Sequence, residues 1–176
     1  NQADPEKVLW NENHAEPLED GRIVEKNSFR RSNYFEHVGN ECKHVTEKVG
    51  LLDMSAFAKC IVKGPGAEEW LEYIFANKMP KTIGRISLVH MLSLNGGVRS
   101  EYTVYKTGPQ SYYLVSAGAF ETHDHDYLFK LLPKDGSVSV QRVTTQTGVL
   151  VLAGPRSRDL LQKLTDTDLS NASFKW

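Results

Sequence analysis

A single carboxylate stands in a segment that otherwise has the composition of a β-strand. The segment NGGVRSEYTVYK, residues 95–106, opens with an Asn-Gly-Gly turn and continues with β-branched and aromatic residues around Glu101. Because side chains alternate along a strand, Glu101 is expected to share a face with Arg99, Thr103 and Tyr105. At a reaction site, a carboxylate can stabilise a cation or accept a proton. The alternative is that Glu101 has no catalytic role and lies on a solvated sheet face, with Arg99 as its diagonal neighbour.

Other motifs point to chemistry only weakly. The run HDHD at residues 123–126 contains good ligands for divalent metals. Residues two apart on a helix point in different directions, so we expect a solvated helix surface and no metal site. The Gly-Pro-Gly at 64–66 lacks the rest of a phosphate-binding loop, and its proline removes an amide donor, so it predicts a plain turn. The sequence contains no GxSxG nucleophile elbow, so this motif gives no support for a hydrolase.

Composition and charge narrow the class of protein. The 176 residues are 40% hydrophobic and 24% charged with a net charge of −1, which is typical of a globular domain. The near-zero net charge does not favour binding to nucleic acid, so we expect a neutral partner or a small ligand. No apolar run approaches the roughly 20 residues of a membrane span, so we expect a cytoplasmic location. Cys42 and Cys60 are too few for a disulfide framework and are predicted to be buried and reduced. The absent initiator methionine and the ending SNASFKW suggest a fragment.

The elements that must position Glu101 begin near Tyr34. Residues 1–33 are polar and without period, which predicts an extended arm or linker. From there the hydrophobic periods and turn residues predict a helix in 40–49, docked on the core and ended by Gly50. Further helices are predicted at 67–77, 120–132 and 157–164, and strands at 58–64, 86–94, 98–106, 111–117, 138–144 and 148–154. Trp10, Trp70 and Trp176 are expected to be core or docking aromatics. This order predicts an α+β, ferredoxin-like fold, with a mostly antiparallel sheet and helices on one side.

The order of several motifs resembles one family. VGLLDMSAFAKCIVKGPGAEEWLEYIFANKMP, HMLSLNGGVRSEYTVYK and GVLVLAGPRSRDLLQKL together resemble the aminomethyltransferase family, which includes the glycine-cleavage T-protein. Within it, the chain is most similar to the folate-binding region of dimethylglycine and sarcosine dehydrogenases. That closer likeness rests on Tyr34-Phe35-Glu36 with Val38-Gly39, the HML at 90–92, Glu121-x-His123-Asp124, and LTDTDLSNASFKW. The resemblance implies that 34–176 is the N-terminal half of a folate-binding domain.

The resemblance also implies particular site residues. The catalytic aspartate that follows the Gly-Gly turn in T-protein relatives falls on Glu101, which keeps the charge on a side chain longer by one methylene. Folate contacts of the family fall on Phe57, Ile61, Leu88 and Val115. For these four, a core role is an equal alternative. Leu88 stands where T-proteins often have tyrosine, and Ala117 where they have asparagine. These two departures favour a dehydrogenase-type relative.

The implied function is one-carbon transfer. Tetrahydrofolate would accept a one-carbon unit from a dimethylglycine- or sarcosine-type amine to form methylene-tetrahydrofolate. The implied partners are a flavin domain, whose FAD this chain would not bind, and a C-terminal folate-binding half. The isolated chain is then expected to be inactive and to bind folate weakly, and a eukaryotic parent would lie in the mitochondrial matrix. The alternatives are a non-catalytic regulatory or assembly module of the same fold, a T-protein, and a folate-dependent demethylase with another methyl donor.

Overall fold

The computed structural model describes residues 15–17, 23–25, 31 and 34–174 of the chain. Contacts divide the chain into two units, residues 53–151 and residues 1–52 with 152–176, and each is described by itself. The helices and strands are β1 Ala15–Pro17, β2 Ile23–Glu25, α2 Phe35–Glu47, β3 Gly50–Asp53, β4 Ala58–Lys63, α3 Ala67–Ile74, β5 Ile86–Leu92, β6 Val98–Gly108, β7 Ser111–Ser116, α4 Glu121–Lys130, β8 Ser139–Arg142, β9 Leu150–Ala153 and α5 Ser157–Leu161. Short 3-10 helices lie at Gly118–Phe120, Thr144–Gln146 and Gln162–Leu164.

The unit at 53–151 contains a ferredoxin-like core. Its five-stranded sheet has the order β5-β6-β7-β4-β8, and all its pairings are antiparallel. Without the edge strand β5, the sequence β4-α3-β6-β7-α4-β8 is the split β-α-β unit of that fold. The predicted α+β, mostly antiparallel architecture is therefore confirmed, with β5 as an additional strand beside β6.

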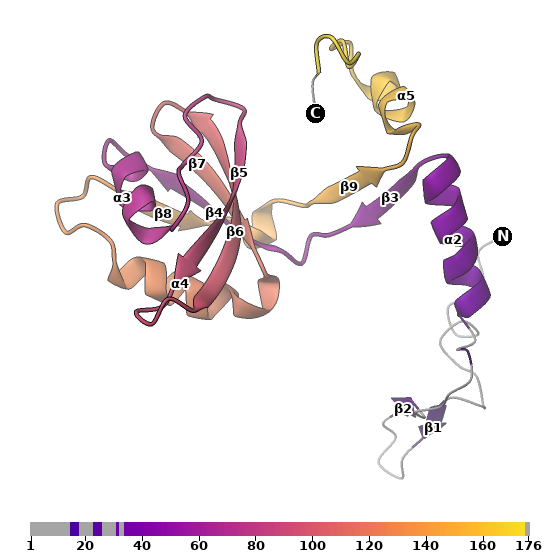
Figure 1. The fold of residues 1–176 in the computed structure, drawn as a ribbon, viewed down its shortest axis with the longest axis horizontal. Helices are drawn as coiled ribbons and strands as arrows, with labels where there is room; N and C mark the ends of the chain where they lie inside the picture. Colours follow the sequence, from indigo (N-terminus) through magenta and orange to yellow (C-terminus); the bar gives the residue numbers. More distant parts are fainter. Residues whose placement is uncertain (1–14, 18–22, 26–30, 32–33, 175–176) are drawn as a thin grey trace. The chain divides into compact units, whose positions relative to one another are not determined.

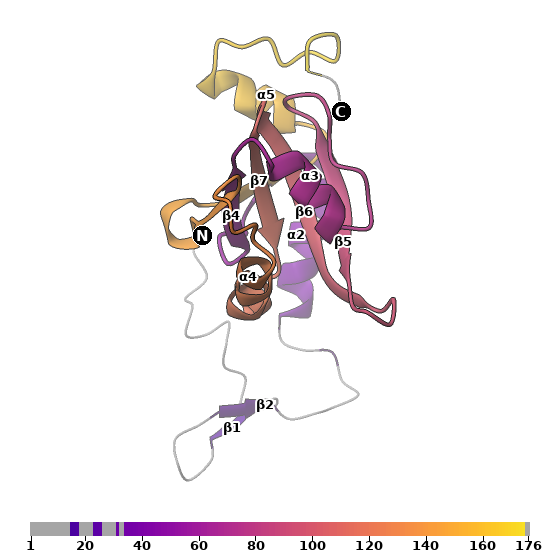
Figure 2. The ribbon, with the colours of Figure 1, turned by 90° about the vertical axis from the view of Figure 1, so that its left-hand side faces the viewer.

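Both helices of this unit cover the same face of the sheet (Figure 1), and Figure 2 shows α3 and α4 in front of the strands. The contacts agree, since one hydrophobic cluster joins residues of α3 and α4 to alternate residues of β4, β5, β6 and β7. Its members include Trp70, Leu71, Leu128, Val104 and Leu114. Because both helices pack on one face, they leave the opposite face of the sheet uncovered within this unit. We call that opposite face the pocket face.

Local sequence explains how β4 turns into α3. Gly64 has φ +130, a conformation that glycine adopts without strain, and Gly66 lies at the start of the helix. Trp70 is buried and donates a hydrogen bond from Nε1 to the Leu131 carbonyl at 2.7 Å, which fastens α3 to the end of α4. The predictions of a plain turn at 64–66 and of a core role for Trp70 are confirmed. Trp10 and Trp176 lie outside the described residues.

Several sequence predictions need correction. The helix expected in 40–49 begins earlier, at Phe35, and none of its described side chains is buried. Its docking on the core stays a prediction. Strand β3, which pairs with β9 in a two-stranded sheet, was not predicted, and its residues follow directly after the expected end of that helix. Cys60 is buried, but Cys42 is exposed on α2.

The predicted domain boundaries stay a prediction. The structure describes only part of the proposed arm at 1–33, where β1 and β2 form an antiparallel pair. Among the described residues, no helix has both the length and the apolar character needed to cross a bilayer.

A charged cluster fastens α3 to the sheet. The buried Lys106 ammonium lies 2.6 Å from Glu68 Oε2 and donates to the Tyr112 hydroxyl at 2.9 Å, and that hydroxyl donates to the same Glu68 oxygen at 2.5 Å. Lys81 binds the other Glu68 oxygen at 2.8 Å. The hydrogen bonds from Lys106, Lys81 and Tyr112 lower the pKa of Glu68 to about 2. Charged hydrogen bonds of this kind make the ionised carboxylate part of the fold.

The lowered pKa of Glu68 predicts a loss of stability in acid. A carboxyl group whose pKa is lower in the folded than in the unfolded chain stabilises the fold above its unfolded pKa, and this contribution disappears as pH falls through the folded value. We therefore expect the difference in unfolding free energy between wild type and Glu68→Gln to shrink as pH falls from 5 towards 2. Because 35% of the Glu68 side chain is exposed, solvent screens its charge, and we expect wild type to be more stable than Glu68→Gln by about 1–2 kcal/mol at pH 5. Urea unfolding of both proteins at several pH values measures this difference. A difference that does not change with pH would contradict the prediction.

Candidate functional site

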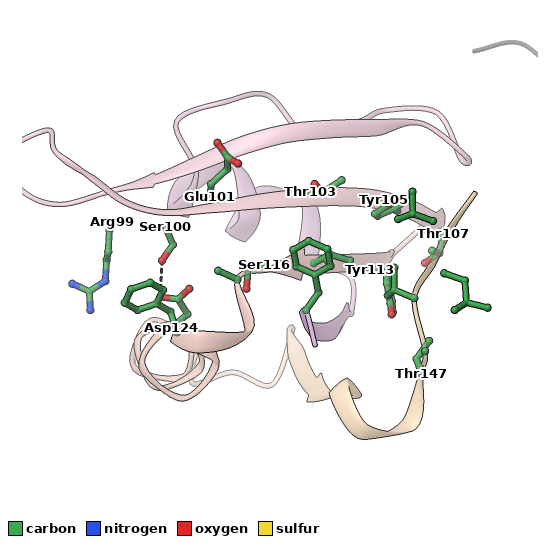
Figure 3. A pocket seen from close by; sticks show the side chains of 18 of the residues that line it. Arg99, Ser100, Glu101, Thr103, Tyr105, Thr107, Tyr113, Ser116, Asp124 and Thr147 are labelled. Atoms are coloured by element: carbon green, nitrogen blue, oxygen red, sulfur yellow. Dashed lines mark hydrogen bonds between the residues drawn. The ribbon is translucent and has the colours of Figure 1, made fainter. Parts of the chain in front are cut away.

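The pocket face carries a hollow of about 970 Å³, at the upper end of the usual range for small-molecule sites. Residues of β6 and β7 form its floor, and Phe57, Phe120, Asp124 and the segment 147–151 complete the lining. Figure 3 shows Thr103, Tyr105 and Tyr113 along this hollow, with Thr147 facing them from the other chain segment. The lining is mostly apolar and aromatic, with a few polar groups, which suits a flat organic ligand better than an ion.

Glu101 lies at one end of the pocket. Its partner in the β-ladder is His90 of β5, and the His90 Nε2 atom lies 3.1 Å from Glu101 Oε2. In Figure 3 the carboxylate leans away from the Asp124 side of the pocket. The Glu101 side chain is 58% exposed, so it can meet a ligand without rearrangement of the core. The predicted alternation at Glu101 is therefore confirmed, since Glu101 is exposed and the next residue, Tyr102, is buried.

Arg99 does not share that face, which corrects the sequence interpretation. The β5–β6 pairing shifts its register between Met91 and Leu92, and this bulge breaks the strict alternation at Arg99. The guanidinium instead reaches α4, where Nη2 lies 2.8 Å from His123 Nε2 and the group stacks over the Tyr127 ring at 4.0 Å. Arg99 is therefore not the diagonal partner of Glu101.

A buried polar cluster lies at the same end of the pocket and was not predicted. Asp124 of α4 has a side chain only 3% exposed, and its Oδ1 accepts hydrogen bonds from Ser100 Oγ at 2.6 Å and from His123 Nδ1 at 3.1 Å. Figure 3 shows Ser100 pointing to Asp124 across the pocket wall. The interpretation of the HDHD run as a solvated surface is thus wrong for Asp124. Through this cluster, Ser100, which precedes Glu101 in β6, is hydrogen-bonded to α4.

The four predicted folate contacts divide into two pairs. Phe57 and Val115 line the pocket together with Glu101. Leu88 and Ile61 lie opposite Thr103 and Tyr113 in the β-ladders and so belong to the same face, but neither is among the lining residues. Leu88 is 53% exposed, on the edge strand. The structure thus brings Phe57, Val115 and Glu101 together and leaves Leu88 and Ile61 outside.

Within the ranges that the structure describes, no group of three or more His, Cys, Asp or Glu side chains is arranged to hold a metal ion. The buried Cys60 is also unsuited to nucleophilic chemistry, because burial raises the pKa of its thiol to about 12. The pocket therefore offers one accessible carboxylate, aromatic ring faces and hydroxyl groups. Such a set can bind a flat ligand and exchange a proton with it.

Comparison with known proteins adds a family and several relatives. The family model described as the GCVT N-terminal domain matches residues 13–176. The mitochondrial dimethylglycine dehydrogenase of Mus musculus is 41% identical over 150 residues, covering 85% of this chain and 17% of the relative. An aminomethyltransferase of Listeria monocytogenes serotype 4b is 35% identical over 141 residues, covering 80% of this chain and 38% of the relative. The chain therefore spans well under half the length of these relatives.

A third relative has a different kind of function. The mitochondrial pyruvate dehydrogenase phosphatase regulatory subunit of Mus musculus is 29% identical over 182 residues, covering 97% of this chain and 21% of the relative.

Solved structures share the fold. The glycine cleavage system aminomethyltransferase T from Bartonella henselae superposes with a TM-score of 0.65 at 22% identity, covering 70% of this chain and 34% of the other. The heterotetrameric sarcosine oxidase from Corynebacterium sp. U-96 gives a TM-score of 0.56 at 19% identity, covering 84% of this chain and 72% of the other. At these identities, the likeness describes the fold alone.

Proposed function

The chain belongs to the GCVT N-terminal domain family, and from this premise we propose that it is the part of a larger enzyme in which tetrahydrofolate accepts a one-carbon unit from an N-methylated amine. The observation that carries the proposal is the position of Glu101 at the end of a pocket lined by aromatic side chains. The 41% identity to a dimethylglycine dehydrogenase supports a dimethylglycine- or sarcosine-type amine as the donor. FAD would then be held by another domain of the parent, and the parent would be mitochondrial, as that relative is.

The residues of the pocket fit a folate. Phe57, Tyr105 and Tyr113 offer ring faces on which a flat heteroaromatic group can stack, and Val115 completes the apolar floor between them. The carboxylate of Glu101 offers acceptors for N–H groups. When bound, tetrahydrofolate supplies the two nitrogens that take up the one-carbon unit.

Glu101 has two roles in this proposal. As an anion beside the reacting nitrogens, it stabilises the positive charge that develops when the one-carbon unit leaves its amine. As a base, it accepts the proton released when the second carbon–nitrogen bond forms. Both roles require a carboxylate that a ligand can reach, which the open strand position of Glu101 provides.

The pocket lining predicts different effects for two of the expected folate contacts, Phe57 and Leu88. We expect Phe57→Ala in the parent protein to weaken tetrahydrofolate binding about tenfold, because an aromatic wall of the pocket is lost. Leu88→Ala serves as the control, since this exposed side chain is outside the lining, and it should leave binding within about twofold of wild type. Isothermal titration calorimetry measures both. Equal losses in the two variants would place the ligand elsewhere on the sheet.

Calorimetry also tests the expectation that this chain alone binds folate weakly. We expect tetrahydrofolate to bind the parent protein more tightly than the 176-residue chain, because the chain spans 17% of its dimethylglycine dehydrogenase relatives. Submicromolar binding by the chain alone would contradict this weakness.

A regulatory or assembly role is the second candidate. It is favoured by the 29% identity to a phosphatase regulatory subunit over 97% of this chain. In that case the pocket could be kept without turnover, and substitutions at Glu101 would leave every folate-dependent rate of the parent unchanged. The rate of methylene-tetrahydrofolate formation by the parent protein therefore distinguishes the two functions.

A further inference from the structure

We propose that His90 is a positioning residue that fixes the carboxylate of Glu101 through a hydrogen bond from its Nε2–H group. The inference rests on the proposed function, because it assigns a partner to the carboxylate on which that function depends. The two side chains lie directly opposite each other on β5 and β6, with Nε2 and Oε2 3.1 Å apart. Because an ionised carboxylate can only accept, the imidazole must carry its hydrogen on Nε2.

The need for such a partner follows from the exposure of Glu101. A glutamate with a 58% exposed side chain has several rotamers available, and only a fraction of them place its oxygens correctly for a bound ligand. Among the described residues, His90 is the hydrogen-bond partner of this carboxylate. That bond occupies Oε2 and leaves Oε1 free for a ligand. Fixing the carboxylate in advance avoids ordering it during the reaction.

His90 is itself well held. Its backbone N–H donates to the Asn77 side-chain oxygen at 3.0 Å, and its carbonyl accepts from the Ala76 N–H at 2.9 Å. On its other side it pairs with β6. The imidazole is 34% exposed, and His90 is not among the residues that line the pocket, whereas Glu101 is. His90 therefore lies outside the pocket lining, and it acts on the ligand only through the carboxylate of Glu101.

Three variants of the parent protein test the inference by turnover. His90→Leu keeps the approximate bulk but removes the donor, and we expect kcat for methylene-tetrahydrofolate formation to fall about tenfold while the Kd for tetrahydrofolate stays within about twofold. His90→Gln restores an N–H donor at a similar reach and should return kcat to within about threefold of wild type. Added to Glu101→Gln, His90→Leu should cause no further loss, because residues that act as a unit are not additive. His44→Leu on the exposed surface of α2 is the control.

A second measurement needs no turnover. Imidazole ¹⁵N spectra of the 176-residue chain should show His90 mainly as the Nε2–H tautomer, and this preference should weaken in Glu101→Ala. Wild-type kcat in His90→Leu, failure of His90→Gln to rescue, multiplicative losses in the double variant, or a tautomer preference that ignores Glu101 would each overturn the inference. If Glu101→Gln abolishes turnover and His90→Leu does not lower it, only this inference fails. If Glu101→Gln leaves turnover unchanged, the proposed function fails, and the positioning role fails with it.

Discussion

Glu101→Gln in the parent protein should lower the rate of methylene-tetrahydrofolate formation by at least about a hundredfold. Glutamine keeps the length and nearly the shape of the side chain, but it removes the negative charge and the ability to accept a proton. Positioned general bases typically contribute 10²–10⁴-fold, so about a hundredfold is the low end of the expected loss. Folate binding should change much less, because the aromatic walls that hold the ligand are retained. Single-turnover kinetics and calorimetry on the same preparation measure the two effects separately.

The control for this variant is another carboxylate on the same unit. Glu69 is exposed on α3, which packs against the opposite face of the sheet, and Glu69→Gln changes the net charge by the same amount. It should leave the rate unchanged. A similar loss in both variants would mean that overall charge matters and that the position of Glu101 does not. An unchanged rate in Glu101→Gln would favour the regulatory role.

Much of the sheet could be predicted because each strand has a simple physical signature. Along β6 and β7 the buried residues alternate strictly with partly exposed ones from Tyr102 onward, as expected for a sheet with one covered face. The turn at 95–97 was also predictable, since Gly96 has φ +78 and glycine tolerates this conformation. Strand β3 was missed because its four residues carry no complete alternation of their own and depend on pairing with β9.

The site was harder to predict, because its geometry depends on contacts between distant segments. The bulge that turns Arg99 towards α4 depends on the register of β5 against β6, which one strand does not encode. His90 was part of a recognised motif, but its role depends on its being the cross-strand neighbour of Glu101. Asp124 could have been found, because it lies four residues before the buried Leu128 and so on the covered side of α4. A carboxylate on the buried face of a helix requires a partner, and Ser100 is that partner.

The open position of Glu101 and the buried position of Asp124 explain why only the former is proposed as the reacting group. Asp124 Oδ1 accepts hydrogen bonds from Ser100 and His123, so a proton transferred to this oxygen would disturb the Ser100 bond that joins β6 to α4. Glu101 loses only its contact with His90. The pocket is therefore lined by one buried and one accessible carboxylate, and only the accessible one can change its charge without breaking a contact between α4 and β6.

Gly118→Ala should lower the free energy of unfolding by about 3 kcal/mol and distort the pocket. A Cβ atom at this position would overlap the carbonyl oxygen of Ala56, a backbone atom that cannot rotate away. Overpacking of this kind typically costs about 1–3 kcal/mol, and a clash with backbone belongs at the upper end. Relief requires the 3-10 helix Gly118–Phe120 to move away from the turn that carries Phe57, so two walls of the pocket separate. Urea unfolding followed by circular dichroism measures the stability of the chain.

Gly108→Ala in β6 is the matched control for this effect. A Cβ atom there would meet the Ser111 Cβ at 3.4 Å, an ordinary van der Waals contact, and the glycine does not have a positive φ. We expect the unfolding free energy of this variant to stay within about 1 kcal/mol of wild type. If both variants were equally stable, the close approach of Gly118 to Ala56 would not be needed to hold the pocket walls together. If Gly118→Ala alone is destabilised and also binds tetrahydrofolate more weakly in the parent protein, the same contact sets both the stability of the unit and the shape of its site.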